Sequence, residues 1–142
     1  MAEEFDFTTY QALSFDIYTT LIDWEAGIFT ELARLLSRVP ESNPIWQKSL
    51  SEVKSHLILR YSKHEHTLEM ENPKEKYPII LVGVYERLAT ELEVNVTRED
   101  ALAFGQAIGT WPAFADTVAA MQSLGKRYKL VALSNVDKAS FG

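Results

Sequence analysis

The sequence predicts an α/β protein that combines a small parallel sheet with a large block of helices. Residues 10–17 and 128–135 are short apolar segments with the residue types of buried strands, and each ends in polar residues. Between these segments the apolar residues recur with the period of a helix, and no further strand is expected. Strands separated by helices pair in parallel, so the carboxyl ends of both strands are expected at one edge of the sheet.

The first predicted helix follows the first strand after a short polar segment. Its apolar residues recur at steps of four and three: Ile28, Leu32, Leu35 and Val39. Pro40 and the polar residues after it break this pattern. We therefore expect a helix over residues 24–38 with its apolar stripe buried.

Four more helices are predicted before the second strand, and three of them follow the first helix without an intervening strand. The second helix begins after Pro44 and has the stripe Trp46, Leu50, Val53, Leu57 and Tyr61. The third has the stripe Tyr77, Leu81, Val84, Leu88 and Leu92. The fourth begins at Thr97, a hydroxyl N-cap residue that is followed three positions later by Asp100. Residues 64–78 are polar and contain prolines, so we expect them to connect the second and third helices rather than to pack.

Two histidines in this polar segment, His64 and His66, flank Glu65. Alternate residues on a helix point apart, and the spacing is not that of a zinc site. We interpret both histidines as residues of a solvated loop, and His56 as a residue on the surface of the second helix. The sequence therefore predicts no metal ion.

A fifth helix is predicted directly before the second strand. Its apolar stripe is Phe114, Val118, Met121 and Leu124, and Gly125 ends it. We divide the chain into residues 1–23, which carry the first strand, residues 24–109, which are helical, and residues 110–142, which carry the second strand.

Composition narrows the classes of function. The net charge of -6 and the pI of about 5.1 argue against nucleic acid, because phosphate-backbone binding requires clustered Lys and Arg. With no cysteine there is no disulfide framework and no thiolate metal site. The acidic start lacks the features of a signal peptide, and the longest apolar run, "IILVGVY", is too short to cross a bilayer. We expect a cytoplasmic protein with no membrane partner.

Polar side chains follow both predicted strands. The first strand is followed by Asp16, Tyr18, Thr19 and Thr20, and the second ends in Ser134 and Asn135. The carboxyl edge of a parallel sheet is where α/β proteins bind their ligands, which makes these residues the candidate site. The alternative for Asp16, Ser134 and Asn135 is an ordinary role in turns or caps.

Two longer segments resemble a known family. "FDIYTTLIDWE" is similar to the first motif of the haloacid dehalogenase (HAD) superfamily in its 2-haloacid dehalogenase-like branch, with an Asp, an aromatic two positions on and a Thr four positions on. "WPAFADTVAAMQSLGKRYKLVALSN" is similar to the approach to the second motif. The resemblance spans nearly the whole chain and implies a Rossmann-like HAD core with a large helical cap inserted over residues 24–109.

The resemblance also implies a mechanism without a cofactor. Asp16 would be the nucleophile that attacks a small organic acid, and water would hydrolyse the aspartyl intermediate. Backbone N–H groups after Asp16 would stabilise the developing negative charge. Thr20 and Ser134 would orient groups in the pocket, Asn135 would hold a polar part of the substrate, and Tyr18 and Thr19 would line the same pocket.

Tyr18 and Gln47 distinguish this chain from two branches of the family. In the phosphatase branch a second Asp stands at the position of Tyr18 and gives a proton to the leaving alkoxide, whereas halide leaves without one. Tyr18 therefore favours carbon–halogen chemistry. Dehalogenases of this branch carry an Arg soon after the Trp of the second cap helix, but Gln47 follows Trp46 here, with Lys48 and Arg60 as possible replacements.

The chain contains the first two family motifs and no match to the later ones. Lys138 lies too close after Asn135 to be the third-motif Lys, and the acidic motif is absent. We therefore expect a truncated HAD-like core, and three interpretations remain. They are a hydrolase, a repurposed protein that binds a small molecule or catalyses an isomerase-, cyclase- or lyase-type reaction, and a fragment without chemistry. Because two parallel strands leave open edges, we expect a homodimer that completes the core.

Overall fold

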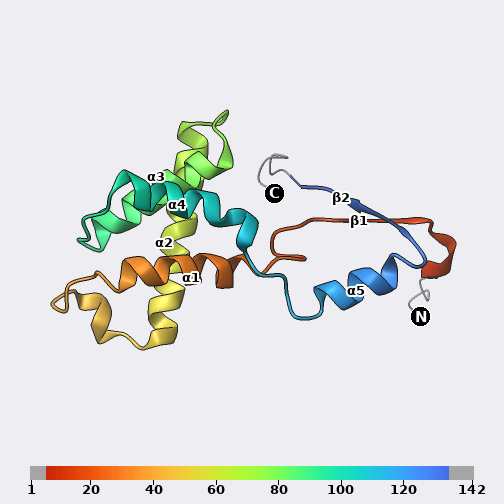
Figure 1. The fold of residues 1–142 in the computed structure, drawn as a ribbon, viewed down its shortest axis with the longest axis horizontal. Helices are drawn as coiled ribbons and strands as arrows, with labels where there is room; N and C mark the ends of the chain where they lie inside the picture. Colours follow the sequence, from red (N-terminus) through yellow and green to blue (C-terminus); the bar gives the residue numbers. More distant parts are fainter. Residues whose placement is uncertain (1–5, 135–142) are drawn as a thin grey trace, which may run out of the picture. The chain divides into compact units, whose positions relative to one another are not determined.

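The computed structural model of the protein describes residues 6–134, which form two compact units (Figure 1). One, which we call the strand unit, comprises residues 6–24 and 112–134. The other, the helical unit, comprises residues 25–111. The helical unit is thus an insertion, in the sequence, between the two segments that build the strand unit.

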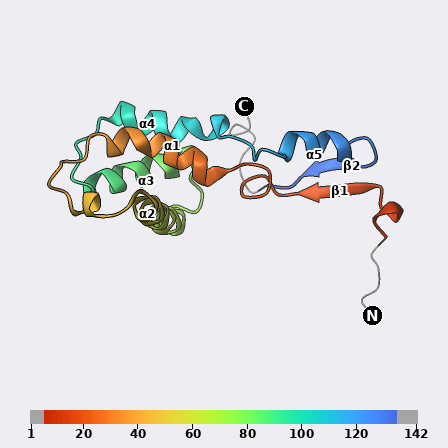
Figure 2. The ribbon, with the colours of Figure 1, turned by 90° about the horizontal axis from the view of Figure 1, so that it is seen from below.

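The strand unit contains a pair of parallel strands and one helix. Its elements are η1 (Phe7–Thr9), β1 (Ala12–Phe15), α5 (Thr117–Leu124) and β2 (Lys129–Ala132). β1 and β2 pair in parallel over their whole length, from Ala12 opposite Lys129 to Phe15 opposite Ala132. Figure 2 shows α5 beside the strand pair, and Leu130 of β2 lies against Gly125 at the end of this helix. The predicted parallel α/β arrangement is therefore present.

The strands and α5 are less buried than the sequence predicts. β1 alternates exposed and half-buried residues, and no residue of α5 is buried. The exposed fraction is 61% for Val118 and for Leu133, and 44% for Val131. The prediction of buried strands and of a buried α5 stripe was wrong for this reason: two strands and one helix offer too little surface to cover both faces of a parallel sheet.

The helical unit holds the apolar core of the described chain. It comprises α1 (Trp24–Leu36), whose first residue is counted with the strand unit, η2 (Pro44–Gln47), α2 (Leu50–Glu71), α3 (Tyr77–Glu91), α4 (Arg98–Gln106) and η3 (Ala107–Thr110). Its largest fully buried side chains are Tyr61, Ile28, Leu32, Leu35, Leu57, Leu81, Leu88 and Val84. Burial of one such side chain stabilises a protein by roughly 1.5–3 kcal/mol, so this unit contributes most of the hydrophobic stabilisation.

The predicted helices are present, with two differences in the second. α2 begins at Leu50, because Pro44–Gln47 forms a separate 3-10 turn and Ser49 then caps α2 in a capping box with Glu52. Trp46 lies outside the helix and is 45% exposed, and Leu50 is 74% exposed. The buried stripe of α2 therefore starts at Val53 rather than at Trp46.

α2 also continues through most of the segment that was predicted to connect. It ends at Glu71, directly before Asn72 and Pro73, the first residues that stop a helix. Its last turns pack on α3: a Cβ built on Gly83 would lie 3.0 Å from the Leu68 side chain. The polar composition misled the prediction, because one narrow face of these turns is enough to hold them against α3. His64 thus lies on a helix, not in a solvated loop.

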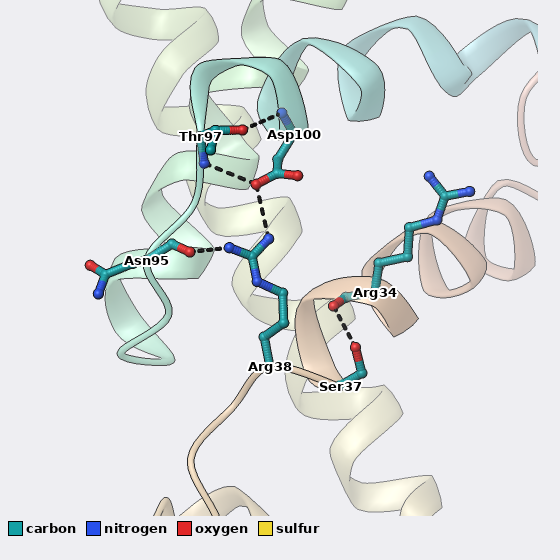
Figure 3. Close-up of polar contacts among 6 residues, drawn as sticks. All are labelled: Arg34, Ser37, Arg38, Asn95, Thr97 and Asp100. Atoms are coloured by element: carbon teal, nitrogen blue, oxygen red, sulfur yellow. Dashed lines mark hydrogen bonds and ion pairs between the residues drawn. The ribbon is translucent and has the colours of Figure 1, made fainter.

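An ion pair joins the end of α1 to the start of α4 (Figure 3). Thr97 and Asp100 form the predicted capping box, with Asp100 N–H donating to Thr97 Oγ1 at 3.1 Å and Thr97 N–H to Asp100 Oδ2 at 2.9 Å. Arg38 Nη1 donates to the same Asp100 oxygen at 2.9 Å, and its Nη2 donates to the Asn95 carbonyl. The Arg38 guanidinium, followed by the Thr97 N–H, lowers the pKa of Asp100 to about 2.

Candidate functional site

Asp16 and Ser134 lie at the same edge of the strand pair. The last paired residues are Phe15 and Ala132, and the Leu133 N–H donates to the Phe15 carbonyl at 2.7 Å. Asp16 directly follows β1, and Ser134 lies two residues after the end of β2, so both lie at the carboxyl ends of the parallel strands. Asp16 is exposed and Ser134 is half-buried. Asn135, the other predicted residue of the second strand end, lies outside the described residues.

A tight turn after Asp16 positions the remaining predicted residues. The Ile17 carbonyl accepts from the N–H groups of Thr20, Leu21 and Ile22 at 3.3, 2.8 and 3.0 Å. Thr19 N–H donates back to the Ile22 carbonyl at 3.1 Å. These bonds fold the chain back on itself, with Tyr18 half-buried and Thr19 and Thr20 exposed. The turn therefore keeps Tyr18, Thr19 and Thr20 next to the strand end that carries Asp16.

Thr19 adopts a backbone conformation that is costly for its residue type. Its φ of 72° lies in the left-handed region, where a β-branched side chain is an outlier. Residues in such conformations cost about 1–3 kcal/mol and cluster at functional sites. Sequence reasoning selected Thr19 only by its place after Asp16, since a glycine would have been the usual signal for this backbone.

The turn is anchored to the segment that leads into α5. Asp23 N–H donates to the Pro112 carbonyl at 2.8 Å, and Phe114 N–H donates to the Leu21 carbonyl at 3.1 Å. The hydroxyl of Thr117, the first residue of α5, donates to the same Leu21 carbonyl at 2.9 Å. Thr117 was not predicted to contribute here, because this bond joins residues that are far apart in the sequence.

The edge of the strand pair thus presents one carboxylate beside several hydroxyl groups. An exposed carboxylate can act as a nucleophile or as an anchor for a polar ligand, and the hydroxyls of Thr19, Thr20 and Ser134 can donate or accept hydrogen bonds. Within residues 6–134, His, Asp and Glu side chains do not gather in groups of three or more that could hold a metal ion. The described part of the site therefore consists of carboxylate and hydroxyl chemistry.

The two cationic residues considered as replacements for the halide-binding Arg lie in the helical unit. Arg60 Nε donates to Glu91 Oε2 at 2.8 Å, Arg60 Nη2 binds Glu91 Oε1, and His64 Nε2 lies 3.0 Å from this oxygen. The Arg60 guanidinium lowers the pKa of Glu91. Lys48, Arg60 and Glu91 line a cavity of about 310 Å³, to which His56 also contributes. The charge of Arg60 is therefore already balanced by a carboxylate.

No protein-family model matches the chain, and no curated protein matches it. Three of the solved structures that match, each over 92% of this chain, are L-2-haloacid dehalogenases. They are PA0810 (TM-score 0.65, 21% identity), the defluorinating enzyme Rha0230 (0.69, 16%) and the enzyme from Xanthobacter autotrophicus (0.66, 13%).

The chain has a HAD-like fold. This confirms the fold class predicted from the sequence. Because the sequence identities are 21% and below, the similarity to these structures is evidence for the fold alone. The chain spans about half the length of these HAD-like structures: 54%, 53% and 49%. Separately, each helix within residues 6–134 is too short or too polar to span a membrane.

Proposed function

We propose that the protein is a HAD-like hydrolase scaffold, similar to 2-haloacid dehalogenases, that acts through Asp16 on a small organic acid in the cytoplasm. The observation that carries the proposal is the place of Asp16: an exposed carboxylate directly after a strand, in register with the strand end that carries Ser134. In this proposal residues 24–109 form the cap, and Tyr18, Thr19, Thr20, Ser134 and Asn135 bind the substrate.

The proposed reaction has two steps. A carboxylate oxygen of Asp16 attacks the carbon that bears the halogen, the carbon–halogen bond breaks, and halide leaves with the bonding electrons. Water then attacks the carbonyl carbon of the resulting ester, which releases a 2-hydroxy acid and a proton and restores Asp16. The N–H groups of Thr19 to Ile22 donate within the turn, so a backbone N–H nearer to Asp16, such as that of Ile17, would stabilise the negative charge on the ester oxygen in the second step.

Tyr18 determines which leaving group this site favours. A phenol in a peptide gives up its proton only at about pH 10, so it is a poor proton donor to an alkoxide at neutral pH. Halide needs no proton. The proposal therefore favours a 2-halo acid over a phosphate monoester.

A direct comparison of two substrates tests the proposed function. Turnover of a 2-chloro acid and of an aryl phosphate is measured side by side for the wild type and for Asp16→Asn. We expect release of chloride from the 2-chloro acid, and its loss in Asp16→Asn because an amide is a poor nucleophile. Thr8→Val, which alters a hydroxyl residue of η1 outside the turn, is the control. Magnesium-dependent phosphatase activity that requires Asp16 would contradict the assignment of Tyr18.

A second candidate function rests on the pairing of Arg60 with Glu91. A guanidinium that is already neutralised offers a halide less stabilisation, which favours a repurposed protein that binds a small molecule or catalyses an isomerase-, cyclase- or lyase-type reaction. A non-catalytic fragment is the remaining interpretation. Both predict no chloride release in the assay above, and ligand-induced shifts in the NMR spectrum would separate the binding protein from the fragment.

A further inference from the structure

A cluster of three titratable side chains joins α2 to the start of α3 within the helical unit. The Tyr61 hydroxyl lies 3.1 Å from Glu65 Oε1 and 3.0 Å from the Tyr77 hydroxyl, and the Tyr77 hydroxyl binds the same Glu65 oxygen. Tyr61 is fully buried, and Tyr77 and Glu65 are half-buried. Three oxygen atoms are therefore in mutual contact, in a place that water hydrates poorly.

Counting protons shows which form of Glu65 suits this arrangement. Three contacts between oxygen atoms require three protons, but two tyrosine hydroxyls supply only two. With an ionised Glu65, one of the three contacts has no proton, and two oxygen atoms face each other with their lone pairs. In the ionised form Tyr61 and Tyr77 both donate to Glu65 Oε1. A neutral carboxyl can donate to Tyr61 instead, so that Tyr61 donates to Tyr77 and Tyr77 to the carboxyl, which closes a ring.

The surroundings of Glu65 act in the same direction. Burial raises the pKa of Glu65, the hydrogen bonds from Tyr77 and Tyr61 oppose this, and the charge of Glu69, one turn further along α2, raises it again. Burial also raises the pKa of Tyr61 and of Tyr77, so both keep their protons. The groups that act on the Glu65 carboxyl are thus Tyr61 and Glu69 on α2 and Tyr77 on α3, and none of them carries a positive charge.

We propose that Glu65 is held as the neutral acid and closes a ring of hydrogen bonds with Tyr61 and Tyr77, which fastens α2 to α3 and loosens when Glu65 loses its proton. Tyr61 and Glu65 lie in the second half of α2, and Tyr77 is the first residue of α3. The ring therefore joins the two helices across the connection of residues 72–76. Release of the proton would leave a poorly hydrated charge between two helices. The helical unit therefore contains a protonation-sensitive contact between α2 and α3, which involves none of the residues of the carboxylate site in the strand unit.

The sign of the pH dependence follows from the raised pKa. A carboxyl with a pKa higher in the folded than in the unfolded state stabilises the fold fully below the ordinary glutamate value of about 4.3. This contribution is lost as the pH rises through the raised folded-state value. Glu65 should therefore stabilise the contact between α2 and α3 most at mildly acidic pH.

Two measurements on the full chain test the proposal. A ¹³C NMR titration of the wild-type protein, labelled at the glutamate carboxyl carbons and assigned with Glu65→Gln, follows the proton directly. We expect the Glu65 signal to titrate above the ordinary glutamate range. A signal that titrates within or below this range would overturn the proposal, whatever the variants do.

Denaturant unfolding against pH provides the second readout. Glu65→Gln keeps one donor and one acceptor and so imitates the neutral acid, and we expect it to lack the part of the stability loss that the wild type shows with rising pH. Glu99→Gln, at an exposed carboxyl of α4 that does not act on Glu65, is the matched control and should retain the loss. Parallel stability curves for Glu65→Gln and the wild type would contradict the proposal.

Discussion

Thr19 shows at the scale of one residue how the turn after Asp16 is held. Its left-handed backbone is unfavourable for a β-branched residue, yet the hydrogen bonds of the turn keep it there. We predict that Thr19→Gly raises the free energy of unfolding by about 1 kcal/mol, because glycine adopts this conformation without strain. If the hydroxyl binds substrate, the same variant loses activity.

The control for this prediction is Thr20→Gly in the same turn. Thr20 does not share the positive φ, so glycine there should lower stability by about 0.5–1 kcal/mol through the greater entropy of the unfolded chain. Denaturant unfolding of both variants gives the comparison. Equal effects of the two substitutions would mean that the backbone of Thr19 stores no strain.

Asp100 links stability to acid pH through a single carboxylate. Its pKa is lowered to about 2 by Arg38 and by the Thr97 N–H, so its contribution is present above the ordinary value near 3.8 and is lost as the pH falls towards 2. We predict that Asp100→Asn is less stable than the wild type at neutral pH and that the difference shrinks at low pH. Thermal unfolding over this range measures it.

Glu99→Gln is the matched control for Asp100→Asn. Glu99 lies in the same first turn of α4 but is fully on the exposed side of the helix, so its loss should change stability little at any pH. A gap between Asp100→Asn and wild type that stays constant down to the lowest pH would exclude the ion pair and cap as its source.

At the scale of elements, α4 depends on close approach to α3. A Cβ on Gly105 would lie 2.4 Å from the Pro78 carbonyl oxygen, a backbone atom that cannot move aside. We predict that Gly105→Ala destabilises the protein by about 1–3 kcal/mol, because the two helices must separate. Urea unfolding of the variant checks the value.

Gly83→Ala provides the contrast within the same pair of helices. The nearest atom there is the end of the flexible Leu68 side chain at 3.0 Å, and alanine favours a helix over glycine by about 0.5–1 kcal/mol. We expect a small change of either sign. A loss as large as that of Gly105→Ala would show that the packing argument misjudges both sites.

The elements also show how far the sequence could predict this fold. The stripes of α1 and α3 were predicted because their apolar residues are buried at helical spacing within one well-packed unit. The start of α4 was predicted from its capping residues, Thr97 and Asp100. The end of α2 was missed, since the half-buried Glu65 is held by hydrogen bonds to two tyrosines that no apolar period reveals. The exposure of β1 and β2 was missed because the apolar composition of a strand does not show whether other elements cover both of its faces.

The candidate site was predictable to the same degree. Asp16, Tyr18, Thr19 and Thr20 were selected as candidates because polar residues after an apolar strand mark a sheet edge. The register of β1 and β2 brings Ser134 to that edge. Thr117 was missed because its contact with the Leu21 carbonyl joins residues that are far apart in the sequence. Long-range hydrogen bonds of this kind leave no periodic signal.

At the scale of the whole molecule, the strand unit exposes apolar residues that a second copy of the chain would cover. Val118, Val131 and Leu133 are exposed by 61%, 44% and 61%, and a two-stranded sheet is marginal in water. We predict that the 142-residue chain forms a homodimer in which these surfaces are covered, with an interface above about 2,000 Å². Analytical ultracentrifugation at micromolar concentration measures the state.

Matched lysine substitutions locate the predicted interface. Val131→Lys should shift the protein towards the monomer, because burial of a charge at an apolar interface is costly. Leu59→Lys, at a side chain of α2 that is 69% exposed, should leave the dimer intact. A well-folded wild-type monomer with a cooperative melt would show that the strand unit needs no partner.

The central claim, that Asp16 is the nucleophile, is tested most directly by following oxygen from the solvent. With the protein in excess over a 2-chloro acid in H₂¹⁸O, water attacks the aspartyl ester, so the carboxyl group of Asp16 should gain ¹⁸O, which mass spectrometry of the peptide that contains Asp16 detects. Label in the hydroxyl of the product with none in Asp16 would mean that water attacks the substrate directly, and it would contradict the account, as would the absence of any reaction.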